Sequence, residues 1–406
     1  MIEISVEEAR RLILDVQGLR TNKPCTSTKD VAKRIHNIQI DTISVVSRSH
    51  NLITFNRFPQ YKEGDIWEVA KKADLFEYWS HAMCMMPIET YPFSVWRRQF
   101  YPGNRTKKWA LEQKDTIDQV YQHVKKNGVT NSASIGETPE GNTGWWDWKI
   151  EKHALEYLFT IGKLMVAFRK GFQKYYDITE RVLPNHIDSE PMTDDEAAEF
   201  VVDSSLGSLG LGCYDDIRTY HNKLPSQGLW KGRKELIEEY LDQRVNDGHL
   251  EEVTIKGMNE RYFTLVKNTQ KLQSGNSVEL STAPVKLLTP FDNILRERIF
   301  PKRMWDFDYK IECYVPAHDR VYGYFILPIL DTNEFAGRLD AKAHRKDGIL
   351  EVKAIYLENN EIQTTEGLER LQLGIEDFAK FHNCDAIKIT KVTPRKLTSK
   401  IRNLFA

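Results

Sequence analysis

The sequence predicts an α+β protein with about three tandem winged helix-turn-helix modules, followed by a β-rich C-terminal domain that also carries a helix. The first observation behind this fold class is a recurring order of elements, in which helices precede a hairpin with a glycine at its tip. This order repeats at intervals of roughly 80 residues, as tandem modules do. The second observation is a change after about Pro284, where strand-like runs replace the helices. The third is the length of 406 residues, which exceeds what one compact core usually holds.

The composition is that of an ordinary water-soluble protein, with 41% hydrophobic and 28% charged residues. No apolar run approaches the roughly 18 residues of a membrane span, and the N-terminus starts an amphipathic helix rather than a signal peptide. We therefore expect a cytoplasmic, nucleoid-associated protein without membrane contact. The five cysteines are scattered without a Cys-x-x-Cys pair, which indicates reduced thiols rather than a disulfide framework or a zinc site.

The net charge of −1 hides an uneven distribution. Residues 1–110 carry 17 Lys and Arg against 12 Asp and Glu, whereas the rest of the chain carries 40 against 46. A basic N-terminal part gives weak support for a phosphate-rich partner. A solvated helix face would produce the same excess.

Helical periodicity and capping residues predict a first module over residues 1–110. Ser5 and Glu8 form a predicted capping box at the start of its first helix. The predicted helices of this module are Ser5–Leu19, Ser27–Ile35, Ile43–Leu52 and Gly64–Ala73.

A short extended run around Gln39 separates the second of these helices from the third. Because strand side chains alternate, Ile38 and Ile40 face one way, and Gln39 and Asp41 face the other. A carboxylate beside an amide, within a belt of cations, could act on a polyanion. Alternatively, Asp41 only caps the helix expected from Thr42 onward, which is a common use of Asp. The two roles are compatible, and the pattern alone leaves both open.

The second module (residues 111–190) and the third (residues 191–283) show the same order of elements. The predicted helices are Glu112–Lys126, Glu151–Ile161, Met192–Leu211 and Lys231–Asn246. The predicted hairpins pair Leu164–Arg169 with Phe172–Tyr176 and Leu250–Ile255 with Arg261–Val266. Between the first two of these helices, Trp145, Trp146 and Trp148 form a cluster that could stack on bases, although pinning a helix to its neighbour is the more common role.

The β-rich C-terminal domain is expected over residues 284–406. Turn signals separate four predicted strands, Tyr309–Val315, Arg320–Leu327, Glu334–Ala343 and Ile349–Tyr356. An amphipathic helix at Gly367–His382 and a last strand at Ala386–Thr390 complete what we expect to be a separate antiparallel domain.

Six segments carry a resemblance to a known family: QIDTISVVSRSHNLITFNRF, FEYWSHAMCMMPIE, GWWDWK, GFQKYYDITERVLP, LLTPFDNILRER and FDYKIECYVPAHDRVYGYFILPIL. In this order they closely resemble the bacterial YcaQ/AlkZ-like winged-helix DNA glycosylases, over most of the chain. The resemblance implies three winged helices and a β-rich domain around an open DNA-binding channel, in agreement with the fold class predicted above.

The resemblance also implies an activity and a site. Members of the family are monofunctional DNA glycosylases that excise N7-alkylated purines and unhook interstrand crosslinks in base excision repair. We therefore expect hydrolysis of the N-glycosidic bond without lyase activity, cofactor or metal. The family signature is Gln, an apolar residue, then Gln or Asp, which assigns catalysis to Gln39 and Asp41 and resembles the YcaQ-like branch. The implied partner is double-stranded DNA carrying alkylated or crosslinked purines, bound by a monomer.

Basic and imidazole side chains are expected to contact the DNA. In the first module these are Lys33, Arg34, Arg48, His50, Arg57 and His81. A solvated helix face explains Arg48, His50 and Arg57 equally well, and His81 could be an ordinary core histidine. The family also places a C-terminal hairpin at the DNA minor groove, and we expect its neighbourhood at Arg296, Arg298, Lys302 and Arg303.

Two other functions remain open on the sequence. A transcription regulator with several winged helices would use this fold without catalysis, since fold does not fix function. A small-molecule hydrolase is disfavoured, because the Gly-x-Ser-x-Gly, His-Glu-x-x-His and phosphate-loop patterns do not occur. Release of a base from alkylated DNA would separate a glycosylase from a regulator.

Overall fold

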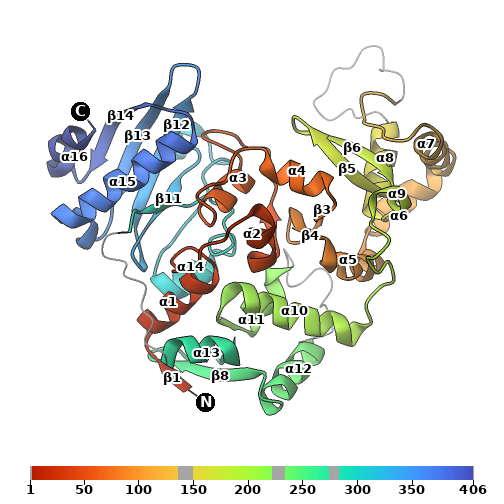
Figure 1. Cartoon of the computed structure of the whole chain (residues 1–406), viewed down its shortest axis with the longest axis horizontal. Helices are drawn as coiled ribbons and strands as arrows, with labels where there is room; N and C mark the ends of the chain where they lie inside the picture. The colour runs from red at the N-terminus through yellow and green to blue at the C-terminus, as the bar shows by residue number, and fades with distance from the viewer. Residues whose placement is uncertain (1, 136–149, 222–233, 274–282, 406) are drawn as a thin grey trace.

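The computed structural model describes residues 2–135, 150–221, 234–273 and 283–405, which form a mixed α+β structure. Figure 1 places residues 327–405 at the left, residues 91–182 at the right and residues 194–273 along the bottom. Residues 28–87 lie between these three parts. The stretch that carries the Gln39 motif therefore occupies the middle of the molecule.

The first part of the chain combines four helices with a small sheet. The helices are α1 (Val6–Val16), α2 (Thr28–Ile35), α3 (Ser49–Phe55) and α4 (Asp65–Lys71). The strands β2 (Ile38–Gln39), β3 (Leu75–Trp79) and β4 (Met83–Pro87) pair in the order β2-β4-β3. The predicted first, second and fourth helices are confirmed, and Ser5 and Glu8 form the predicted capping box.

The helix predicted over Ile43–Leu52 is wrong in its first half. Residues 42–48 form an irregular loop, and α3 begins only at Ser49. Val46 is buried in the core of the C-terminal sheet, and Ile43 and Val45 pack against the same core. Burying these three side chains against a distant part of the chain outweighs the local helix preference.

The second part contains two long helices and the predicted hairpin. After α5 (Tyr91–Arg97) come α6 (Asn104–Glu112), α7 (Lys114–Asn127) and α8 (Ile150–Thr160), then β5 (Leu164–Lys170) and β6 (Gln173–Ile178). The hairpin turns at Gly171, whose φ of +61° suits glycine. Trp145, Trp146 and Trp148 lie outside the described residues, so the interpretation of that cluster stays a prediction.

The third part has the predicted helices and hairpin, together with short elements that were not predicted. Its elements are α10 (Asp194–Leu209), β7 (Gly212–Cys213), α11 (Tyr214–Tyr220), α12 (Lys234–Asn246), β8 (Leu250–Ile255), β9 (Tyr262–Leu265) and α13 (Val266–Gln273). The N-terminal strand β1 (Ile2–Ile4) pairs in parallel with β8. The first residues of the chain thus complete a sheet of this third part.

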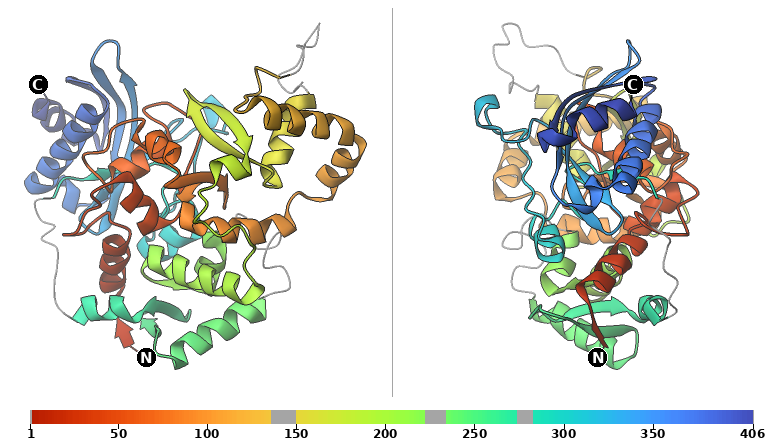
Figure 2. Two further views of the ribbon diagram at one scale, coloured as in Figure 1. Left: turned by 45° about the vertical axis from the view of Figure 1, so that its right-hand side comes forward. Right: turned by 90° about the vertical axis from the view of Figure 1, so that its left-hand side faces the viewer.

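A five-stranded sheet dominates the C-terminal part. Its strands β10 (Lys286–Leu287), β11 (Leu327–Asp331), β12 (Glu334–His344), β13 (Ile349–Leu357) and β14 (Ala386–Thr393) lie in that order. The pairing of β13 with β14 is parallel, which corrects the expected antiparallel domain. A parallel pair needs a crossover, and α15 (Thr365–Phe381) supplies it on one face of the sheet (Figure 2). Within the described residues of this C-terminal part, α14 (Ile299–Trp305) and α16 (Thr398–Leu404) were not predicted.

The strands predicted at Tyr309–Val315 and Arg320–Leu327 are wrong. Between α14 and β11 the chain forms a loop with one short 3-10 helix, Ala317–Asp319. The Glu312 carboxylate folds this loop back, accepting hydrogen bonds from the backbone N–H groups of Val321, Tyr322 and Gly323 at 2.9, 2.8 and 3.0 Å. In the right-hand view of Figure 2 the loop projects from the opposite side of the sheet to α15.

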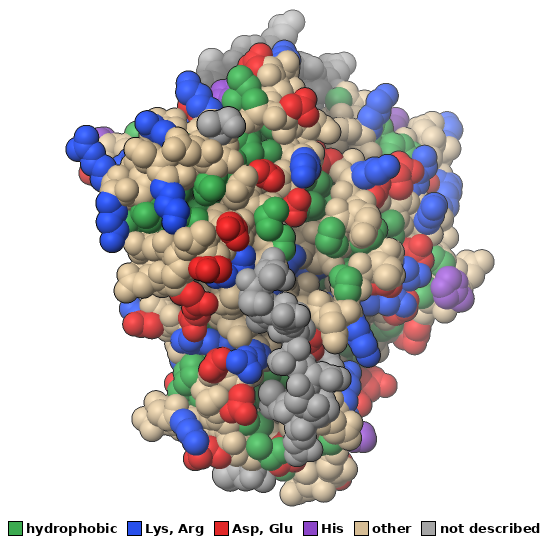
Figure 3. All heavy atoms as spheres, turned by 60° about the vertical axis from the view of Figure 1, so that its left-hand side comes forward, with side chains coloured by type: hydrophobic (Ala, Val, Ile, Leu, Met, Phe, Trp, Pro, Cys, Tyr) green, Lys and Arg blue, Asp and Glu red, His purple; other side chains and the backbone are tan. Residues whose placement is uncertain are grey.

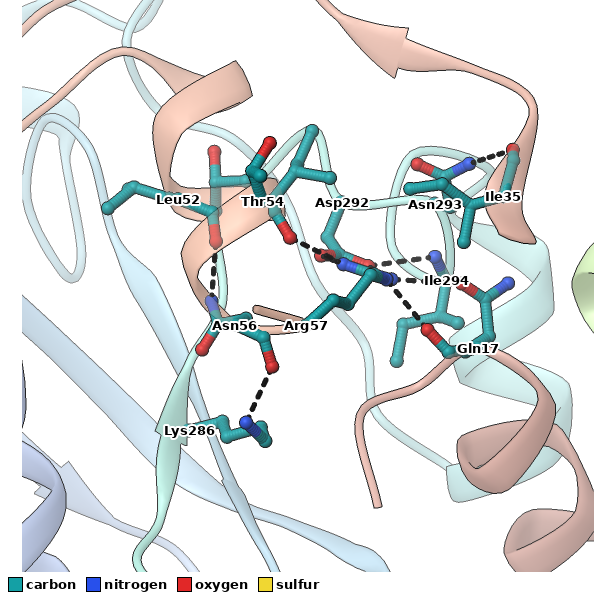
Figure 4. A network of polar contacts seen from close by, with 12 residues as sticks. Gln17, Ile35, Leu52, Thr54, Asn56, Arg57, Lys286, Asp292, Asn293 and Ile294 are labelled. Atoms are coloured by element: carbon teal, nitrogen blue, oxygen red, sulfur yellow. Dashed lines mark hydrogen bonds and ion pairs between the residues drawn. The ribbon is translucent and has the colours of Figure 1, made fainter. Parts of the chain in front are cut away.

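A buried ion pair ties α3 to the C-terminal part. The Arg57 guanidinium contacts both carboxylate oxygens of Asp292, at 2.7 and 2.9 Å, and donates to the backbone oxygen of Gln17 at 2.7 Å (Figure 4). Both charged side chains are completely enclosed. The network therefore joins three distant segments in the interior, behind the loop that follows Asp41.

Candidate active site

The Gln39 motif lies at the end of the small sheet of the first part. Gln39 pairs with Cys84 of β4, and the Ile40 N–H donates to the Met83 carbonyl at 2.9 Å, so the backbone pairing reaches Ile40. The burial alternates as predicted, with Ile38 and Ile40 buried and Gln39 and Asp41 partly exposed, although the strand itself ends at Gln39.

The Gln39 amide is held by a histidine. Nε2 of His81 lies 3.1 Å from Oε1 of Gln39, and the imidazole donates this hydrogen bond when Nε2 carries the proton. His81 belongs to the turn between β3 and β4 and is buried. Sγ of Cys84 lies 3.9 Å from Nδ1 and 4.0 Å from Nε2 of the same ring. The turn of the sheet thus fixes the amide before any substrate arrives.

Asp41 is not a helix cap. Its Oδ2 accepts the backbone N–H of Ile43 at 3.1 Å, which closes a turn at the start of the irregular loop. Burial raises the pKa of Asp41, while the N–H groups of Ile43 and Thr42 and the positive charge of Arg48 act in the opposite direction. The site therefore contains a half-buried carboxylate with one cation in electrostatic reach.

That cation sits on an aromatic support. The Arg48 guanidinium lies 4.3 Å from the ring centroid of Phe172, near the tip of the β5–β6 hairpin. His50, two residues along, is buried against Trp67, with ring centroids 5.0 Å apart. Burial lowers the pKa of His50 to about 3, so this imidazole is neutral. The hairpin of the second part thus reaches the Asp41 site through Phe172 and Arg48.

The projecting loop between α14 and β11 borders the site from the C-terminal side. Burial raises the pKa values of Cys313 and Tyr314, and the Asp41 carboxylate adds to both increases, which puts the two side chains in its electrostatic field. Tyr314 is 80% exposed and Val321 is 70% exposed, although the backbone between them is fixed by Glu312. Sequence reasoning missed this border because the segment resembles strands.

Several residues expected to bind DNA are enclosed in the protein. Arg57 pairs with Asp292, His50 packs on Trp67, and His81 holds Gln39. A side chain without solvent contact cannot reach a phosphate group. For Arg57, His50 and His81 the structure therefore favours internal roles over the expected contacts with DNA.

Lys33 and Arg34 face a different part of the molecule. Both line a cavity of about 1080 Å³ between α2 and α10, whose lining does not include Gln39 or Asp41. Lys33 forms an ion pair with Glu89 at 2.9 Å, and Arg34 donates to the Lys23 carbonyl at 2.9 Å. Their placement does not support contact with a substrate at Asp41.

The segment expected near the minor-groove hairpin is a helix, not a hairpin. Residues 299–305 form α14, because Phe300, Met304 and Trp305 bury one of its sides. Arg296 donates to the Tyr220 carbonyl, Arg298 to the Pro290 carbonyl, Arg303 pairs with Asp216, and Lys302 pairs with Asp308. Arg296 and Arg303 thus contact the third part, whereas Arg298 and Lys302 bond within the C-terminal part. The helix at residues 299–305 corrects the expected hairpin position.

The arrangement can support hydrolysis at a surface. A carboxylate with a raised pKa can accept a proton or stabilise positive charge, and the neighbouring amide can hold a water molecule. Within the described ranges, no group of three His, Cys, Asp or Glu side chains is placed to bind a metal ion. Likewise, none of the described helices combines the length and apolarity of a membrane span.

Comparison with known proteins gives two findings. A family model described as DNA glycosylase AlkZ-like matches residues 32–374. Among solved structures, the chain is similar to the Streptomyces sahachiroi DNA glycosylase AlkZ, with a TM-score of 0.65 and 14% sequence identity, over 96% of this chain and 100% of that one. At this identity the structural similarity speaks for a shared fold. The family match includes both the Gln39 motif and the loop that carries Tyr314.

Proposed function

The chain belongs to the AlkZ-like DNA glycosylase family, and we propose that it hydrolyses the N-glycosidic bond of N7-alkylated purines in duplex DNA and unhooks interstrand crosslinks. Family membership disfavours the alternative of a transcription regulator without enzymatic activity. The observation that carries the proposal is the half-buried Asp41 carboxylate, two residues after the Gln39 amide that His81 holds at the end of a strand.

The substrate supplies much of the driving force. Alkylation at N7 gives the purine a positive charge, so the base departs with the electron pair of the glycosidic bond and needs no acid from the protein. The sugar is left with oxocarbenium character, and a water oxygen then bonds to its C1′. The protein has to stabilise the positive sugar and to remove one proton from the water.

Asp41 has the properties for both tasks. In its ionised form the carboxylate stabilises the oxocarbenium charge and accepts the proton of the attacking water. Burial raises its pKa and so makes it a stronger base, while Arg48 and the Ile43 and Thr42 N–H groups favour the ionised form. Gln39 binds the same water through its amide, which His81 holds in position.

The position of Asp41 suits a base that remains tied to the opposite strand. Most glycosylases rotate the base into a tight pocket, but a crosslinked base cannot leave the duplex. Gln39 and Asp41 line neither the cavity of about 1080 Å³ nor the one of about 280 Å³. Beside them Tyr314 is largely solvent-exposed. An open site of this kind accommodates a duplex without extrusion of the base.

Around this site we propose the following assignments. Arg48 and Tyr314 contact the DNA near the lesion, and the protein acts as a monomer. The three helix-and-hairpin units are winged-helix modules over residues 1–110, 111–190 and 191–283, with β1 contributed to the third, and residues 284–406 form the C-terminal domain. A lyase needs an amine that forms a Schiff base with the sugar. The cation that acts on the Asp41 pKa is the guanidinium of Arg48, which does not form one, and this favours a glycosylase without lyase activity.

The test is base release from a duplex that holds one N7-methylguanine. Wild-type protein and Asp41→Asn are incubated with the duplex, and strand breaks are scored with and without alkaline treatment. We expect breaks only after alkali for the wild type, and a loss of at least about a hundredfold in the variant. Breaks without alkali would argue for a lyase. Salt-sensitive DNA binding without any base release would favour the alternative function, a transcription regulator without enzymatic activity.

A further inference from the structure

The last strand and helix of the chain form a surface of one charge sign. After Asp385 the sequence has no Asp or Glu and six Lys or Arg residues. All six are exposed: Lys388, Lys391, Arg395, Lys396, Lys400 and Arg402. Figure 3 shows Lys and Arg side chains gathered at the upper left of the molecule, over this part. We refer to these six residues as the C-terminal basic strip.

The strip is held rigidly on the sheet. β14 is the outer strand, and such an edge leaves backbone carbonyl groups without partners. Arg402 of α16 covers two of them, donating through Nε to Ile389 at 3.2 Å and through Nη2 to Thr390 at 2.6 Å. On the other side of α16, Ile401 is buried in the core of the sheet. The cations of the strip are therefore attached to a rigid strand and helix, which lowers the entropic cost of binding a ligand.

Within the described part of the chain, only one carboxylate is known to act on the strip: Glu351 of β13 lies opposite Lys388 and interacts with it electrostatically. Among the described residues, none of its six cations forms an ion pair with Asp or Glu. Lys391 lies 5.2 Å from the ring centroid of Tyr356, and Lys400 donates to the hydroxyl of Thr365 at 3.3 Å. Six exposed cations with a single carboxylate beside them leave a net positive surface, which attracts a polyanion.

The strip begins near the catalytic loop and leads away from it. Ala386, at the start of β14, pairs with Ile349, next to the turn between β12 and β13. In that turn, Arg345 donates to the Val46 carbonyl at 2.7 Å, in the loop that follows Asp41. From there the eight residues of β14 extend for about 25 Å. This distance corresponds to roughly seven base pairs of DNA.

We propose that the C-terminal basic strip binds the phosphates of the duplex arm that leaves the lesion, up to roughly seven base pairs beyond the loop that follows Asp41. The proposal rests on the proposed function, because it places the lesion at Asp41. It concerns a part of the chain beyond residues 32–374, where the family match ends. Through the strip, affinity depends on the length of the duplex as well as on the damaged base.

The test compares two duplex lengths with one triple variant. Lys388→Gln/Arg395→Gln/Lys396→Gln removes three cations without removing the bonds made by Arg402, Lys400 and Lys391. The probes are duplexes of about 10 and about 40 base pairs, each with a central N7-methylguanine. We expect the Kd for the long duplex to rise about tenfold, and the slope of log K against log salt to fall by roughly 2 to 3. The Kd for the short duplex should not change.

A matched control neutralises three cations at the other end of the molecule. Lys114→Gln/Lys125→Gln/Lys126→Gln changes three exposed lysines of α7, which Figure 1 shows opposite α16. The control should bind both duplexes like the wild type. Equal losses on the two lengths, equal losses in the control, or an unchanged Kd of the strip variant would overturn the proposal. The protein could also be tested on anionic phospholipid vesicles. If it bound them more tightly than the long duplex, and the strip variant lost this binding, the ligand of the strip would be a membrane surface and not DNA.

This experiment also separates the inference from the function on which it rests. If the wild type releases no base but shows the length-dependent binding, the glycosylase proposal fails and the strip is still a DNA-binding surface. If base release occurs normally and the strip variant binds the long duplex like the wild type, only the inference about the strip fails.

Discussion

The imidazole of His81 lies 3.1 Å from the amide oxygen of Gln39, and this contact links the Gln39 motif to the turn between β3 and β4. Because His81 is itself buried and close to Cys84, it has little freedom to move. The orientation of the Gln39 amide is therefore a property of the folded sheet. A residue that acts through another in this way is a positioning residue.

We expect His81→Ala to slow base release by roughly ten- to a hundredfold, because a misoriented Gln39 amide no longer holds the water correctly. The Kd for DNA should stay the same. In a double-mutant cycle, His81→Ala should add little to the loss already caused by Gln39→Ala, since both remove one function. Single-turnover rates measure this coupling. Independent losses that multiply would show that His81 acts in another way.

The pH dependence of base release should report Asp41. Burial raises its pKa above the ordinary value, and the carboxylate works only when ionised. The rate should therefore fall as the pH is lowered through this raised pKa, and reach a plateau above it. Arg48 favours the ionised form, so Arg48→Gln should move the acidic limb to higher pH. Single-turnover rates, corrected for spontaneous depurination, test this, and a shift to lower pH would contradict the assignment.

The same pKa shift predicts the stability of the Asp41→Asn protein. A carboxylate whose pKa is raised on folding costs stability once the pH exceeds its unfolded value, because burial disfavours the charge. An asparagine removes this cost and keeps an oxygen for the Ile43 N–H. We therefore expect a Tm at pH 7 equal to or above that of the wild type. A clearly lower Tm would mean that loss of activity in this variant reflects misfolding.

Tyr314 should contribute to catalysis through its ring. A side chain that is 80% exposed on a loop fixed by Glu312 is available to stack on DNA, and such stacking is worth about 1–3 kcal/mol. Tyr314→Ala should therefore reduce kcat/KM by roughly tenfold or more, while Tyr314→Phe should stay close to the wild type. Leu111→Ala is a suitable control, because Leu111 on α6 is similarly exposed at 78%. If the Phe variant lost as much as the Ala variant, the hydroxyl would be the important group.

Sequence patterns predicted those structural features that are determined by residues close together in the chain. The capping box of Ser5 and Glu8, the helix stop at Gly128 and the hairpin turn at Gly171 follow from short-range backbone chemistry. The alternation around Gln39 was equally readable, since one face of a strand must be buried. The mixed α+β class and the alternation around Gln39 could therefore be predicted from local patterns, whereas the proposed roles of Gln39 and Asp41 rest on the family resemblance.

Long-range contacts determined the parts that sequence reasoning missed. Val46 is buried by the C-terminal sheet, far away in the sequence, and this prevents the helix expected there. Arg57 looked like a surface cation because its partner, Asp292, is 235 residues away. The segment around Tyr314 has the sequence pattern of strands, but three backbone hydrogen bonds to the Glu312 carboxylate fold it into a loop. None of these partners can be recognised from local spacing.

The pair of Arg57 and Asp292 should be essential for folding. Removing one member leaves a fully buried charge without its partner, which typically costs about 3–5 kcal/mol. We expect Asp292→Asn and Arg57→Met each to lower stability by this amount in urea unfolding. The double variant Arg57→Met/Asp292→Leu should recover much of the loss, because it leaves no unpaired charge. For comparison, Asp242→Asn breaks an exposed pair with Arg261 and should cost less than about 1 kcal/mol. A double variant as unstable as the sum of the single variants would mean that the hydrogen bonds to Gln17, rather than the paired charges, hold the three segments together.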